Sequence, residues 1–98
     1  MKFNIYLTQI ARKALRQLKK DPGKNKDYKS VKKAIILLSE NPRHPGLQTH
    51  IVHSIKGPSG EKVFEAYAQQ NIPSAYRIFF CYEPDKKEIT IVATIPHP

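Results

Sequence analysis

The sequence is short of cysteine, tryptophan and acidic residues. Cys81 is the one cysteine in 98 residues, so a disulfide cannot form within the chain. The longest aliphatic run covers only residues 34–38 and the mean hydropathy is -0.52, which excludes a membrane-spanning helix. The first residues also lack the apolar stretch of a secretory signal, so we expect a cytoplasmic protein.

The charge of the chain is strongly positive and unevenly distributed. Seventeen Lys and Arg against eight Asp and Glu give a net charge of +9. Residues 1–43 hold twelve of the basic residues and three of the acidic ones, whereas residues 44–98 hold five of each. The cations of the first half are therefore either a solvated helix surface or a contact for nucleic acid. Hydrophobic residues make up 40% of the chain, enough for one core, and we expect a single domain over residues 1–98.

The first half of the sequence has the apolar spacing of two helices. Stripes of Leu, Ala, Val and Ile predict helices over residues 8–20 and 28–40, with Thr8 as a candidate N-cap. Asp-Pro-Gly at 21–23 and Asn-Pro at 41–42 should end them, and the short loop between them predicts an antiparallel hairpin. Six cations off the apolar stripes are expected to be exposed and are candidates for RNA binding: Arg12, Arg16, Lys19, Lys20, Lys32 and Lys33.

From Gly46 onward the apolar residues alternate, which is typical of strands. Strands are expected over residues 49–55, 62–68, 74–82 and 88–95, and residues 3–6 could form an edge strand. The strand over 74–82 is apolar on both faces and should be central. In the last strand four residues are expected to share one face: Ile89, Ile91, Ala93 and Ile95. The predicted fold is α+β, an N-terminal helical hairpin packed on a mostly antiparallel sheet of four to five strands.

Few residues of this sequence have the spacing of a chemical site. His50 and His53 would lie on opposite faces of a strand, so we expect no metal site and no cofactor. Arg77 places a permanent charge in the most apolar strand. It either pairs with Glu65 across the sheet or faces a groove where it contacts phosphate. His97 is either part of a loose tail or a site residue.

Several segments together resemble the RelE/ParE superfamily of bacterial toxins. Residues 7–15 resemble its opening pattern L-T-x-x-A-x-K-x-L, and residues 38–42 its L-x-x-N-P helix ending. Residues 75–80 are similar to its Y-R-I-x-F strand, and residues 89–97 to its last strand and terminal His. Each pattern alone is common, but their order and spacing across nearly the whole chain are specific.

The resemblance implies the toxin of a type II toxin-antitoxin pair, held inactive by a cognate antitoxin protein. RelE-like members cleave mRNA on the ribosome without a metal ion, and ParE-like members poison DNA gyrase. On the matching positions, Arg77 would stabilise the scissile phosphate and His97 would act as general acid or base. The resemblance therefore implies a metal-independent endoribonuclease, an mRNA interferase, that inhibits translation.

The sequence departs from the family pattern at three points. Tyr67 stands where members usually carry Arg, and only Pro98 follows His97, where many members run on to a final Tyr. Residues 69–74 also lengthen the approach to Arg77. These departures favour the alternative, a gyrase inhibitor or a catalytically weak member that only binds its antitoxin, whereas the basic helices favour the ribonuclease.

Overall fold

The computed structural model describes residues 2–97, which form two α-helices and a five-stranded sheet. In chain order the elements are β1 (Asn4–Leu7), α1 (Gln9–Lys20), α2 (Asn25–Glu40), β2 (His50–Lys56), β3 (Lys62–Tyr67), β4 (Tyr76–Glu83) and β5 (Glu88–Pro96). The strand order is β1-β5-β4-β3-β2. β1 runs parallel to β5 and the other neighbours are antiparallel, so the predicted α+β fold is confirmed.

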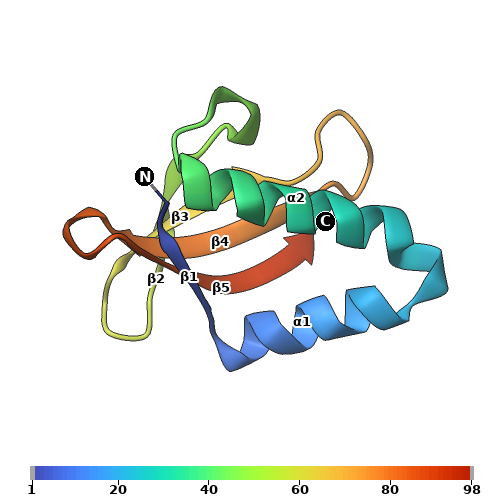
Figure 1. The fold of residues 1–98 in the computed structure, drawn as a ribbon, viewed down its shortest axis with the longest axis horizontal. Helices are drawn as coiled ribbons and strands as arrows, with labels where there is room; N and C mark the ends of the chain where they lie inside the picture. The colour runs from blue at the N-terminus through green and yellow to red at the C-terminus, as the bar shows by residue number, and fades with distance from the viewer. Residues whose placement is uncertain (1, 98) are drawn as a thin grey trace.

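Both helices pack on one face of the sheet (Figure 1). We call the opposite face, which neither α1 nor α2 covers and which bears Glu65 and Arg77, the open face. β4 lies between β5 and β3, as its apolar residues on both faces predicted. No helix within residues 2–97 is long and apolar enough to cross a membrane.

The ends of the helices follow from local sequence signals. Thr8 caps α1, since its hydroxyl oxygen accepts the Ala11 N–H at 3.1 Å. The helix ends at Lys20, before Asp21 and Pro22, as predicted. α2 begins at Asn25, three residues earlier than predicted, because residues 22–24 form one 3₁₀ turn that leads directly into it.

The core lies between the helices and the sheet. The helices contribute small and aliphatic residues from the predicted stripes, among them Ala11, Val31 and Leu38, which are inaccessible to solvent. The sheet contributes Ile78 and Phe80 from β4, and the Phe64 ring stacks on the Phe80 ring at 5.8 Å between centroids. The face of β4 that carries these side chains is thus the face that meets the helices.

β5 contains a bulge that corrects one prediction. Phe79 pairs with Ala93 but Phe80 pairs with Ile91, so Val92 is an extra residue. Ala93 and Ile95 therefore lie on the open face, not beside Ile89 and Ile91, and Thr94 faces the helices and is buried. The Thr8 hydroxyl donates to the Val92 carbonyl at 2.8 Å, so one side chain caps α1 and also occupies the bulge.

Candidate functional site

A buried carboxylate on the open face joins two basic side chains. Glu65 Oε2 lies 2.5 Å from Arg77 Nη1, and Glu65 Oε1 lies 2.8 Å from His50 Nε2. Only 7% of the Glu65 side chain is exposed, against 16% for Arg77 and 49% for His50. Three strands thus contribute one group each: β2 His50, β3 Glu65 and β4 Arg77.

One of the two predictions made for Arg77 is confirmed, and its contact with phosphate stays a prediction. The ion pair expected with Glu65 is present, and the guanidinium carbon lies 5.2 Å from the centre of the Phe79 ring. Arg77 Nε is buried with no hydrogen-bond partner among the described residues. Glu65 accepts a hydrogen bond from one of the five N–H groups of the Arg77 guanidinium. The guanidinium therefore keeps donors for a further acceptor such as phosphate.

A cavity of about 300 Å³ adjoins this cluster and brings in His97. Gln48, Tyr67, Ala75 and His97 line it, and Tyr67 is the register partner of Arg77 across β3 and β4. The His97 N–H donates to the Ala75 carbonyl at 2.8 Å, so the chain stays bound to the sheet here and is no loose tail. His97 and Ile95 share the open face because they are two residues apart.

The segment 69–74, which lengthens the approach to Arg77, forms part of the wall of this cavity. Gln69 is buried and anchors it: its amide nitrogen donates to Asp27 in α2 at 2.7 Å, and its amide oxygen accepts the Tyr76 N–H at 3.0 Å. Within residues 2–97, three of the four non-glycine residues with positive φ border this region: Gln48, Asn71 and Ser74. Strained backbone of this kind is concentrated at functional sites.

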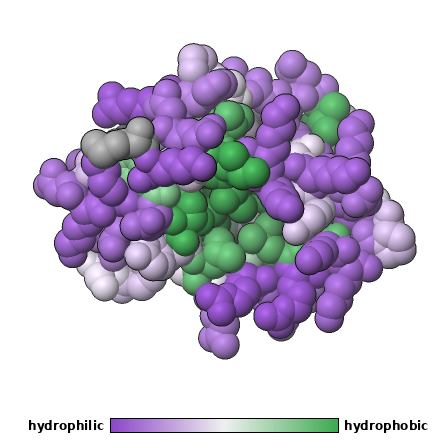
Figure 2. Space-filling view, viewed as in Figure 1, coloured by the Kyte–Doolittle hydropathy of each residue, from purple (hydrophilic) through white to green (hydrophobic). Residues whose placement is uncertain are grey.

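The six cations predicted for RNA binding are exposed on the hairpin of α1 and α2: Arg12, Arg16, Lys19, Lys20, Lys32 and Lys33. The structure adds a groove of about 490 Å³ between the two helices, which sequence analysis did not predict. Leu7, Leu15, Tyr28, Ile35 and Ile36 form its apolar part, and Arg12, Arg16, Lys19 and Lys32 its basic rim. Figure 2 shows the apolar atoms in the middle of this side of the molecule, surrounded by hydrophilic ones.

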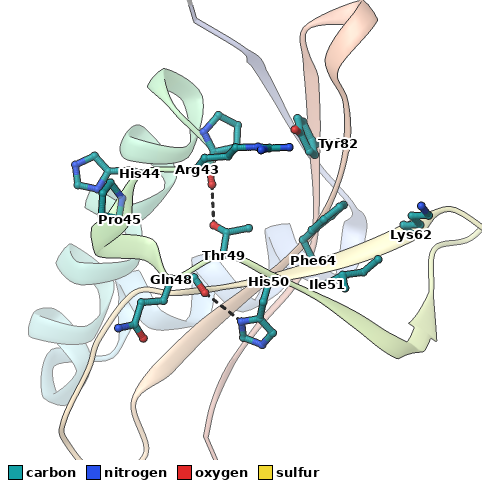
Figure 3. Close-up of a pocket in the computed structure, with 11 residues that line it drawn as sticks. Arg43, His44, Pro45, Gln48, Thr49, His50, Ile51, Lys62, Phe64 and Tyr82 are labelled. Atoms are coloured by element: carbon teal, nitrogen blue, oxygen red, sulfur yellow. Dashed lines mark hydrogen bonds between the residues drawn. The ribbon is translucent and has the colours of Figure 1, made fainter.

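A larger cavity, of about 610 Å³, lies beside β2 and the turn that precedes it. Phe64, Tyr82 and Ile51 line it, and Arg43 extends across it toward Tyr82 (Figure 3). The His50 ring turns away from Phe64 and Tyr82, toward the Gln48 carbonyl (Figure 3). His50 thus lines the larger cavity, whereas His97 and Tyr67 line the smaller one.

Cys81 and the acidic side chains offer no second site within residues 2–97. Burial, together with the Glu61 carboxylate, raises the pKa of the Cys81 thiol and so keeps it in the protonated form, which is a poor nucleophile. In the same part of the chain no three His, Cys, Asp or Glu side chains are grouped so that they could hold a metal ion.

Sequence analysis did not predict the contact of His50 with Glu65. Its partners are Glu65 and the backbone carbonyl of Gln48, and the pairing of β2 with β3 sets this contact. The signal that could have found it is the register of β2 and β3, which places His50 directly opposite Glu65, the predicted partner of Arg77. The sequence alone drew attention to His50 only together with His53, as possible metal ligands.

Comparison with known proteins identifies the fold. No protein-family model and no curated protein matches the sequence. Among solved structures, the chain is similar to archaeal RelE in a RelE-RelB complex from Pyrococcus horikoshii, with a TM-score of 0.66, 19% identity, and coverage of 98% of this chain and 96% of that one. The chain is also similar to a mutant of the E. coli toxin RelE in the free state, with a TM-score of 0.58 and 16% identity. That match covers 97% of this chain and 83% of the RelE chain. The chain therefore has the fold of the RelE toxins.

Proposed function

We propose that residues 1–98 form one toxin domain of a type II toxin-antitoxin pair, and that it cleaves mRNA on the ribosome without a metal ion. The observation that carries this is the cluster of Arg77 and His50 on Glu65, beside which Tyr67, the register partner of Arg77, lines a cavity together with His97. Arginine suits a phosphate, and histidine transfers protons near neutral pH. Side chains of these types are sufficient for cleavage of RNA by its own 2′-OH.

In the proposed reaction the ribose 2′-OH attacks the adjacent phosphorus and the 5′ oxygen of the next nucleotide leaves. Arg77 stabilises the negative charge that grows on the phosphate, and its contacts with Glu65 and Phe79 hold the guanidinium in place beforehand. His97, at the cavity that adjoins Arg77, exchanges a proton with the substrate. Tyr67, in the same cavity, offers an aromatic ring against which a base can stack.

The experiment that tests this function is primer extension on programmed ribosomes with a defined codon in the A site. The wild type is expected to cut the mRNA at that codon, and His97→Ala to cut about a hundredfold more slowly, the usual contribution of a proton-transfer group. Equal rates for the two proteins would remove His97 from the site. A wild type that arrests growth, inhibits DNA supercoiling and cuts nothing would identify a gyrase inhibitor instead.

The exposed cations of the helical hairpin support a ribosomal partner, since the ribosome surface is rich in phosphate. We expect Arg16→Glu with Lys20→Glu to weaken ribosome binding and to reduce its salt dependence, by roughly one unit of log-log slope for each phosphate that the variant no longer neutralises. Sedimentation with ribosomes at several salt concentrations measures both effects. The control is Lys56→Glu with Lys86→Glu, which makes the same charge change at two exposed positions outside the hairpin. Equal weakening by both pairs would mean that only net charge matters.

The groove between α1 and α2 supports the second partner, the cognate antitoxin. An apolar groove with a basic rim is complementary to an amphipathic acidic segment. Such a segment would cover Arg12, Arg16 and Lys19, and would thereby compete with ribosomal RNA for the same cations.

A further inference from the structure

Glu65 holds His50 by one oxygen while it holds Arg77 by the other. The pair distances are 2.8 Å from Oε1 to His50 Nε2 and 2.5 Å from Oε2 to Arg77 Nη1. Because Glu65 is almost fully buried on β3, its carboxylate holds both basic groups in defined positions. The exposed member of the cluster is His50, whose side chain is half in solvent.

The two ring nitrogens of His50 face different partners. Its Nε2 faces the Glu65 carboxylate, and its Nδ1 lies 3.0 Å from the Gln48 carbonyl oxygen. Both partners are acceptors, so each ring nitrogen must carry a hydrogen for both bonds to form. Nε2 is held by the buried carboxylate, so Nδ1 is the ring nitrogen that can give a proton to a substrate.

We propose that His50 is the general acid of the RNA cleavage described above, and that Glu65 is its positioning residue; the inference rests on that proposed function. The Nδ1–H of His50 leaves the Gln48 carbonyl and protonates the departing 5′ oxygen as the bond from phosphorus to this oxygen breaks. His50 keeps its Nε2–H on Glu65 throughout. His97 accepts the proton of the 2′-OH as the new bond to phosphorus forms. The products are a 2′,3′-cyclic phosphate and a free 5′-OH, and both histidines then exchange protons with water.

The order of the strands suits this division of roles. β4, which carries Arg77, lies one strand from the end of β5 near His97 and two strands from β2 and His50. His50 is level with Ala93 of β5, and His97 lies four residues further along. At roughly 4.8 Å per strand and 3.3 Å per residue, the two histidine backbones are separated by about 20 Å, with Arg77 between them. A phosphate held by Arg77 would therefore have one histidine on each side, as a displacement with base and acid at opposite ends requires.

The experiment compares two short mRNAs on the ribosome, one natural and one with sulfur in place of the 5′ oxygen at the scissile bond. A thiolate leaves without being protonated, because a thiol is far more acidic than an alcohol. His50→Gln is expected to cut the natural mRNA about a hundredfold more slowly than the wild type, and the sulfur mRNA within about tenfold of the wild type. His97→Ala, which removes the base, should stay slow on both. Glu65→Gln should cut the natural mRNA more slowly than the wild type does. Its deficit should be smaller on the sulfur mRNA, because Glu65 acts partly by positioning His50.

The controls separate loss of chemistry from loss of folding. His53→Gln changes a nearby exposed histidine of β2 and should cut both mRNAs as the wild type does, and thermal melting checks that every variant is folded. Equal slowing of His50→Gln on both mRNAs, or no slowing, would overturn the assignment. If the sulfur mRNA restored the rate of His97→Ala and not that of His50→Gln, His97 would be the general acid. This result would also overturn the assignment of His50. A wild type that cuts neither mRNA would overturn the proposed function itself, and the inference with it.

Discussion

Replacing Arg77 with alanine is expected to slow mRNA cleavage about a hundredfold or more and also to destabilise the fold. The first effect follows from losing one preorganised donor to the developing phosphate charge. The second arises because Glu65, with 7% of its side chain exposed, would lose one of its two partners. Loss of one member of a buried pair costs several kcal/mol, and since His50 still binds Glu65 we expect about 2 to 3 kcal/mol.

Two measurements separate these effects of Arg77. Urea unfolding gives the change in stability, and single-turnover cleavage at saturating toxin, well below the unfolding midpoint, gives the change in chemistry. Adding Glu65→Gln to Arg77→Ala should restore part of the stability, because the unpaired carboxylate is gone, and should restore no cleavage. A variant that is destabilised but cuts as fast as the wild type would leave Arg77 as a purely structural residue.

Phe80→Ala is expected to have the largest effect on stability in this chain, about 3 to 5 kcal/mol. Phe80 is fully buried on the central strand, and its ring stacks on the Phe64 ring at 5.8 Å and lies 6.3 Å from the Tyr82 ring. Removal of its ring would leave a cavity among side chains of the helices and of the sheet. For a domain whose total stability is about 5 to 15 kcal/mol, this loss removes at least about a fifth of the free energy of unfolding.

Urea unfolding monitored by circular dichroism measures this loss. Ile10→Ala is the matched control: it also shortens an apolar side chain, but Ile10 is 71% exposed on α1, so we expect a change within about 0.5 kcal/mol. A loss below about 1 kcal/mol for Phe80→Ala would mean that its neighbours refill the space, and would contradict the packing described.

The elements of this fold could be predicted because each is marked by local sequence. The helices were predictable from apolar spacing with a Thr cap and Pro stops, and β4 from apolar residues on both faces. The bulge in β5 could not be predicted, because residues 89–95 contain no glycine and the apolar Val92, which interrupts the alternation, also fits a regular strand with two covered faces. It depends on the Thr8 hydroxyl, which comes from the other end of the chain and bonds to the Val92 carbonyl.

The site was predictable only where a residue conflicts with its own surroundings. Arg77 could be identified because a charge in an apolar strand requires a partner, and Glu65 was the acid at hand on the neighbouring strand. His50 conflicts with nothing in its own segment. Its importance depends on which residue lies opposite it on β3, and that register is set by the whole hairpin. The groove between α1 and α2 likewise depends on the packing distance of two helices, which apolar spacing does not specify.

The parallel pairing of β1 with β5 delays completion of the sheet during folding. Residues that pair between β1 and β5 are 84 positions apart in the sequence, so their pairing closes a loop of 84 residues. Closing such a loop costs roughly 4 kcal/mol of chain entropy, more than the short hairpins β2-β3 and β4-β5 require. Local hairpins therefore form before β1 can dock, although β1 is synthesised first. A nascent chain on the ribosome cannot complete the sheet, or bring His97 to the cavity that Tyr67 lines, until residues 88–97 have emerged from the exit tunnel.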